Sequence, residues 1–167
     1  MKKMNILIIG GILVAIGLFF LWYTFISRAN PILPQKEIKI NDSVFSVEIA
    51  STTIEQSRGL SGRNELSQNS GMLFLFNYSG VQSFWMKDMK FTIDIIWIGN
   101  NPSSSEDSDW SGKVLGFVEN APIQPNAQLW QLNIYNSPDG VSSVLEVDAG
   151  TVKRDNIKVG DVVNYFH

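Results

Sequence analysis

The sequence predicts a mainly β fold (α+β with one or two short helices), a compact antiparallel sandwich or partly open barrel, preceded by a transmembrane helix. Many short apolar runs are separated by turn residues, and helix signals are few. One long uncharged segment lies at the N-terminus. The expected organisation is a cytoplasmic stub and membrane anchor over 1–29, a linker over 30–36, and an extracytoplasmic β-rich domain over 37–167.

The anchor is predicted over residues 6–26, which carry no charge. A helix of this length spans about 30 Å, the thickness of a bilayer core. Lys2 and Lys3 precede the segment, so the positive-inside rule predicts a single-pass membrane protein with a cytoplasmic N-terminus. A cleaved signal peptide, with Ser27-Arg28-Ala29 at its cleavage site, is the alternative, which the length of the apolar stretch disfavours.

The amino-acid composition limits which catalytic and metal-binding residues the domain can use. The chain has no cysteine, which excludes a Cys nucleophile and a thiolate metal site. Its one histidine is the last residue, His167, which removes the commonest general base and the commonest metal ligand. We therefore expect no metal site and no cofactor. Residues 1–29 carry a charge of +3 and the rest of the chain −6, since all 16 acids lie there. This balance disfavours nucleic-acid binding.

The first elements of the domain have clear local signals. Glu37–Ile40 and Val44–Ile49 flank a turn, Asn41-Asp42-Ser43, which is typical of a hairpin. Thr52 and Glu55 have the spacing of a capping box, and Gly59 suits the end of the short helix that follows.

The remainder reads as strands joined by irregular segments. Asn100–Gly112 is expected to be an exposed loop, and Glu119–Gly140 a long irregular excursion. Asp148 is a candidate cap for a short helix over Ala149–Arg154. The predicted strands are Met72–Phe76, Gln82–Met86, Phe91–Ile98, Lys113–Val118, Val141–Val147 and Val162–Phe166.

A set of short motifs occurs in order along the domain: Arg58-Gly59-Leu60, Arg63, Gly71-Met72-Leu73-Phe74, Phe84-Trp85-Met86-Lys87, Ile93-Asp94-Ile95-Ile96, Val144-Leu145-Glu146-Val147, Ala149-Gly150, Ile157 and Gly160-Asp161. Together they resemble the bacterial and archaeal family called domain of unknown function 192. The resemblance covers Ile38 to Val163 and implies a small β-rich domain, often behind a signal or anchor. It implies no agreed activity. Asp88-Met89 stands where the family usually has Asn-Thr.

Two carboxylates are the strongest candidates for chemistry. Asp94 lies in an apolar strand and needs a partner, for which Arg58 or Arg63 is suitable. A structural pair is the first interpretation of Asp94, and a ligand or catalytic role the second. Glu146 points away from the face of its strand neighbours. It is either a solvated strand residue or a second carboxylate near Asp94 for acid–base work on sugars.

The other candidates are apolar or cationic. Trp85 and Met86, with Met72 and Met89, suit core packing better than binding of Cu(I) or another cation. Trp110, Trp130 and Tyr135 suit sugar or protein contacts, or cover the edges of the core. The full set of candidate binding residues is Arg58, Arg63, Trp85, Met86, Lys87, Asp94 and Glu146.

Three function classes remain open from the sequence. The favoured one is an accessory module on the outer membrane face that binds a small molecule or an envelope protein, with an apolar or concave surface near Asn120–Asp139. A structural or assembly element of the envelope is the second. A carboxylate-dependent hydrolase of envelope sugars is the third, and we lean against an enzyme.

Overall fold

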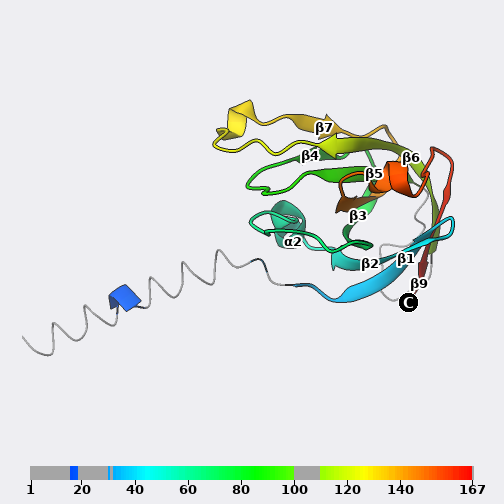
Figure 1. Cartoon of the computed structure of the whole chain (residues 1–167), viewed down its shortest axis with the longest axis horizontal. Helices are drawn as coiled ribbons and strands as arrows, with labels where there is room; N and C mark the ends of the chain where they lie inside the picture. The colour runs from blue at the N-terminus through cyan, green and yellow to red at the C-terminus, as the bar shows by residue number, and fades with distance from the viewer. Residues whose placement is uncertain (1–15, 19–29, 31, 100–109, 167) are drawn as a thin grey trace, which may run out of the picture. The chain divides into compact units, whose positions relative to one another are not determined.

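Seven strands hydrogen-bond in the order β1-β2-β3-β8-β5-β6-β9 and close into a barrel (Figure 1). The structure, a computed structural model, describes residues 16–18, 30, 32–99 and 110–166. The chain divides into two units, Met1–Pro31 and Ile32–His167, and the second contains the barrel. The barrel strands are β1 Gln35–Ile40, β2 Ser43–Ala50, β3 Ser70–Gly80, β5 Ile93–Gly99, β6 Trp110–Ala121, β8 Val141–Asp148 and β9 Val162–Phe166.

The mainly β class is confirmed, but the arrangement is neither a sandwich nor open. β1 pairs with β9, with Lys39 opposite Asn164, and this pairing closes the barrel. β2 and β3 are parallel, because the chain crosses from the end of one to the start of the other through a short helix. All other neighbouring barrel strands are antiparallel. Pairing between strands far apart in the sequence cannot be read from local patterns.

Local signals gave the first elements correctly. The predicted hairpin forms, and its turn residue Asn41 has a φ of +53°. Helix α2, Thr53–Arg58, begins with the predicted capping box between Thr52 and Glu55. It ends at Gly59, whose φ is +50°. A Cβ on Gly59 would lie 3.3 Å from the ring of Phe74 in β3, so glycine also lets the helix end approach the sheet.

The central strands of the barrel are buried on both faces, as the continuous apolar runs predict. One face of β3, β8 and β5 fills the barrel, with Leu73, Leu145 and Ile96 among the core residues. The opposite face carries Met72 and Phe74, among others, and belongs to a second apolar cluster outside the barrel. This outer cluster requires a cover from other parts of the chain.

Part of the cover is a two-stranded sheet, β4 Ser83–Trp85 with β7 Ile134–Asn136, which we call the arm together with the loop of residues 122–133. The loop contains a turn of 3-10 helix, η1 Leu129–Gln131. Phe84 in β4 packs edge-to-face on Phe74 and Trp97, with ring centroids 4.9 and 5.6 Å apart. The predicted irregular excursion over 119–140 is therefore wrong in part, since it holds β7 and the end of β6.

Asp94 is fully buried, and its partners are backbone N–H groups rather than an arginine. Its Oδ1 accepts from the N–H of Asn120 and its Oδ2 from the N–H of Val152, both at 2.8 Å. The prediction of a pair with Arg58 or Arg63 is wrong. Val152 lies in the first turn of helix α3, Thr151–Arg154. Asp94 therefore accepts a hydrogen bond from the N-terminus of this helix, the role that the sequence predicts for Asp148 as a cap.

Arg63 instead forms a two-pronged ion pair with Glu48 of β2, in which Nη2 and Oε2 are 2.7 Å apart. Glu48 Oε2 also accepts the N–H of Leu33 at 2.6 Å. The pair thus joins the start of the domain and the loop after α2 to the barrel.

Two predicted segments fall largely outside the described residues. Of the expected anchor, 6–26, only 16–18 are described, and they are helical. Among the residues that the structure describes, no helix is both long enough and apolar enough to cross a membrane. Of the expected loop Asn100–Gly112, residues 100–109 are not described, and β6 already begins at Trp110.

Replacing the Asp94 carboxylate should destabilise the domain strongly. Asp94→Ala leaves the buried N–H of Val152 and the part-buried N–H of Asn120 without their acceptor, which costs about 3 kcal/mol in the free energy of unfolding. Urea unfolding of residues 32–167 measures this cost. The control is Asp42→Ala in the exposed hairpin turn, expected to stay within about 0.5 kcal/mol. Equal effects of the two variants would contradict the proposed role of Asp94.

Candidate functional site

A cavity of about 200 Å³ lies against the outer face of the barrel, lined by α2, the residues that follow it, and β4. Figure 1 shows α2 and β4 on the same side of β3. The apolar lining is Leu60, Phe74, Phe76, Phe84, Trp85 and Met89. The polar lining is Thr53, Gln56, Ser57, Arg58, Ser61, Gln82, Ser83 and Glu146.

Glu146 is the buried acid of this cavity. It projects from β8 on the face opposite Leu145 and Val147, and only 5% of the residue is exposed. Its Oε2 lies 3.8 Å from the position that a Cβ on Gly59 would occupy, so the carboxyl group sits beside the end of α2. Burial raises the pKa of Glu146 to about 8. The side chain therefore holds its proton at neutral pH, and the solvated-strand interpretation is wrong.

Glu146 differs from the other two buried acids, Glu48 and Asp94, in the contacts of its carboxyl group within the described residues. Glu48 has Arg63 and the Leu33 N–H, and Asp94 has two backbone N–H groups. The hydrogen bonds and ion pairs seen among the described residues include none of the Glu146 carboxyl group, and its oxygens are not among the enclosed atoms left unpaired there, because the group lines the cavity. A carboxyl group with a raised pKa in a cavity is a candidate for contact with a ligand.

The two glutamines of the cavity are held by the backbone. The Gln56 amide nitrogen donates to the carbonyl of Leu75 at 2.6 Å, and that of Gln82 to the carbonyl of Val141 at 3.4 Å. These bonds use donors of both amides, with one N–H of Gln82 left over, and the amide oxygens are chemically able to accept. The protonated Glu146 adds a donor, and Arg58 adds a cationic side chain. The cavity can thus both donate to and accept from a small molecule, against aromatic surfaces.

The structure brings together three of the seven residues predicted for the site. Arg58, Trp85 and Glu146 line the cavity. The other four predicted residues lie outside the cavity, and each has other contacts. Arg63 pairs with Glu48, Met86 is in the outer apolar cluster, Lys87 pairs with Asp88 at 3.0 Å, and Asp94 is enclosed.

Sequence reasoning missed several cavity residues. Gln56 and Gln82 were not singled out, because isolated glutamines in a helix and at a strand start give no signal of a site. Phe74 and Phe84 were assigned only to strands and motifs. Across the described ranges, no three side chains of His, Cys, Asp or Glu come close enough to hold a metal ion.

Fold and cavity together define a small closed β-barrel domain with a covered outer face and one partly polar cavity. The profile of the family DUF192, described as "Uncharacterized ACR", matches residues 36–165. The chain belongs to this family, as the sequence motifs indicate.

Two solved structures share the fold. A proposed transcription regulator from Sinorhizobium meliloti is 25% identical, with a TM-score of 0.67 over 82% of this chain and 98% of its own. A protein of unknown function from Novosphingobium aromaticivorans is 28% identical, with a TM-score of 0.66 over 81% of this chain and 89% of its own. No curated protein matches the chain.

The raised pKa of Glu146 predicts that stability falls as pH rises. The ordinary value is 4.5, so the unfolded chain loses this proton at lower pH than the folded domain, and the free energy of unfolding declines between 4.5 and about 8. The slope from this group is roughly 1.4 kcal/mol per pH unit. Urea unfolding of residues 32–167 at several pH values should show it.

Glu146→Gln should remove this component of the slope, because glutamine does not titrate. The exposed Glu119→Gln serves as a matched control and should leave the slope as it is. If Glu146→Gln and the unmodified domain kept the same pH dependence, Glu146 would be ionised in the folded state and the description of the cavity would be wrong.

Proposed function

We propose that the domain is a binding module that takes a small, neutral, hydroxyl-bearing molecule, of the kind of a sugar, into the cavity beside Glu146. The observation that carries the proposal is the place of the Glu146 carboxyl group, which is 5% exposed in the cavity wall among aromatic and amide side chains. A hydroxyl group accepts from Glu146 and Arg58 and donates to the glutamine oxygens, while the aromatic lining receives the apolar faces of the ligand.

The proposed location is the outer face of a cell membrane. The support is the uncharged segment 6–26 preceded by Lys2 and Lys3, which is typical of an anchor with a cytoplasmic N-terminus. The module would then act on molecules of the envelope, as an accessory to other envelope components.

Binding is favoured over hydrolysis, because a carboxylate pair is not available in the cavity. Acid–base cleavage of a sugar needs two carboxyl groups on either side of the bond. Asp94, the expected second acid, is enclosed and does not line the cavity. Nor do we propose nucleic-acid binding from the name of the Sinorhizobium relative, since a charge of −6 outside residues 1–29 disfavours contact with phosphates.

A thermal-shift screen of residues 32–167 against monosaccharides, cell-wall fragments, amines and metal ions tests the proposal. A ligand at 100 times its Kd stabilises the folded state by about 2.7 kcal/mol, which is several degrees for a domain of this size. We expect a shift with a hydroxyl-bearing compound, weakening as pH rises through about 8.

Two substitutions of one residue give a sharp control. Glu146→Gln keeps a neutral donor, so it should retain the shift and lose the pH dependence. Glu146→Leu keeps a side chain of similar size without the polar group, so it should abolish the shift while the domain stays folded. If Glu146→Gln abolished binding, and binding to the unmodified domain strengthened with pH, the ligand would be a cation and the proposed class would be wrong.

A further inference from the structure

We infer that the outer end of the arm docks on the surface of a lipid bilayer, with Leu129 and Trp130 entering the interface. Leu129 and Trp130 are not part of the cavity lining, and Trp85 is the residue at which this surface adjoins it. The inference takes from the proposed function only the location of the domain beside a membrane, and it does not depend on the ligand.

The arm exposes large apolar side chains at its end. Trp130 is 82% exposed and Leu129 64%, in the 3-10 turn η1. Figure 1 shows this turn at the outer end of the arm, beyond the paired part of β4 and β7. Trp85 and Ile134 stand opposite each other in the arm ladder, and both are exposed. The apolar surface thus continues from the turn onto the outward face of the two strands.

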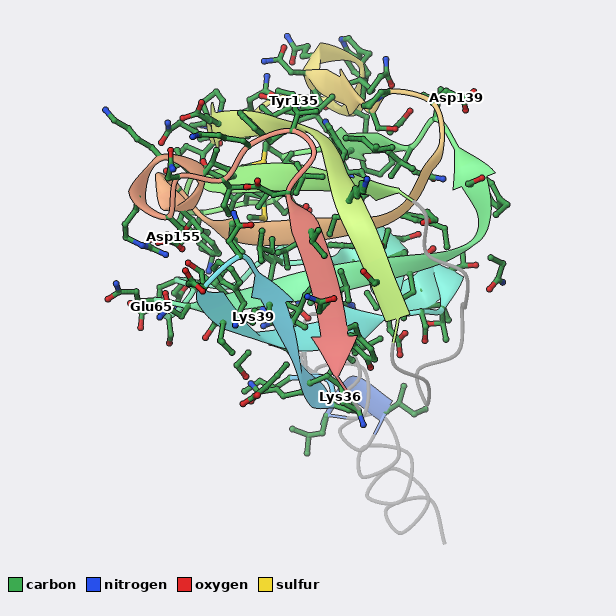
Figure 2. The ribbon with its side chains drawn as sticks, turned by 90° about the vertical axis from the view of Figure 1, so that its right-hand side faces the viewer. Lys36, Lys39, Glu65, Tyr135, Asp139 and Asp155 are labelled. Atoms are coloured by element: carbon green, nitrogen blue, oxygen red, sulfur yellow. The ribbon has the colours of Figure 1, made fainter. Side chains whose placement is uncertain are left out.

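Both halves of the arm lack charge. Residues 120–138 contain no Asp, Glu, Lys, Arg or His, and neither do residues 66–86, which include β4. In Figure 2, Tyr135 marks the arm at the top of the domain, and Asp139, the first charged residue after the arm, is labelled at a similar height, while Lys36, Lys39, Glu65 and Asp155 lie lower, on or beside the barrel. Charged groups are expensive to place in a bilayer, so their absence fits insertion into lipid.

The polar groups of the turn bond to one another. The Gln131 N–H donates to the Gln128 carbonyl at 2.8 Å, and the Gln131 side-chain oxygen accepts the Gln128 N–H at 2.8 Å. Gln124 closes the base of the loop, where its side chain accepts from the Asn133 N–H and donates to the Gln131 carbonyl. Each of these bonds lowers the cost of moving the polar groups that it joins out of water.

These features favour lipid over a protein partner. Tryptophan prefers the headgroup level of a bilayer, and a narrow projecting turn suits insertion better than a flat contact does. An anchor over 6–26 would also hold a bilayer near the start of β1. From Ile26, the end of the expected anchor, to Gln35 there are nine residues, which extend to about 30 Å at most. A tethered surface meets the arm at high effective concentration.

The first test uses the absence of native cysteine in the full chain. Leu129→Cys and Val159→Cys each introduce one site for a fluorescent label, and the two native side chains are equally exposed, at 64% and 65%. Each labelled chain is placed in phosphatidylcholine nanodiscs with lipids that carry a quencher. We expect several-fold stronger quenching at position 129 than at 159.

Equal quenching at the two positions would overturn the inference. A second outcome would also overturn it, namely a label at position 129 that neither a water-soluble quencher nor the lipid quencher reaches. In that case a second copy or another protein would cover the arm.

The second test removes the expected anchor. Residues 32–167 form a unit with its own barrel and core, so they can be added to phosphatidylcholine vesicles and sedimented. Leu129→Ser with Trp130→Ser should lower the vesicle-bound fraction tenfold or more, at about tenfold per apolar side chain withdrawn from lipid. Val159→Ser with Val162→Ser is the control and should change it little.

Unchanged vesicle binding by the arm variant would overturn the inference. The sugar thermal shift is measured on the same arm variant, so that the two proposals are judged apart. If Glu146→Leu lost the sugar thermal shift but still bound vesicles, the result would concern the cavity alone. The proposed docking surface would be unaffected.

Discussion

The rest of the structure depends on one constraint, which is that β3, β8 and β5 are apolar on both faces. A barrel can bury only the inward face, so the outward face of these strands requires a second layer. The chain supplies it from segments that contribute little to the barrel, namely α2 with the loop after it, and the arm. The edge-to-face contacts of Phe84 with Phe74 and Trp97 hold the arm against the sheet.

The way the outer layer covers the sheet also decides which partners each buried acid has. Asp94 accepts hydrogen bonds from two backbone N–H groups, and Glu48 forms an ion pair with Arg63. Both carboxylates therefore join segments of the domain to the sheet. At Glu146 the cover approaches through Gly59 at the end of α2, and burial raises the pKa of the carboxyl group to about 8, so it keeps its proton at neutral pH. The proposed ligand would meet this carboxyl group in the cavity between the sheet and its outer layer.

The outer layer also links the two proposed activities. The segments that frame the cavity belong in part to the arm, whose far end carries Trp130. A module that rests its arm on lipid would hold its cavity close to the membrane surface. The binding site and the docking surface remain chemically distinct, since the first is polar and holds a titrating acid while the second is uncharged.

The sequence by itself determined the β-rich class, the hairpin at Asn41, the capping box of α2 and the family, because turn residues, alternation and short motifs act over a few positions. It also marked Asp94 and Glu146 as acids in apolar strands. Only the tertiary structure decided that β1 meets β9, that β2 and β3 run parallel, and that Asp94 bonds to Val152 while Glu146 faces a cavity. These outcomes depend on contacts between residues tens of positions apart, for which a local pattern carries no signal.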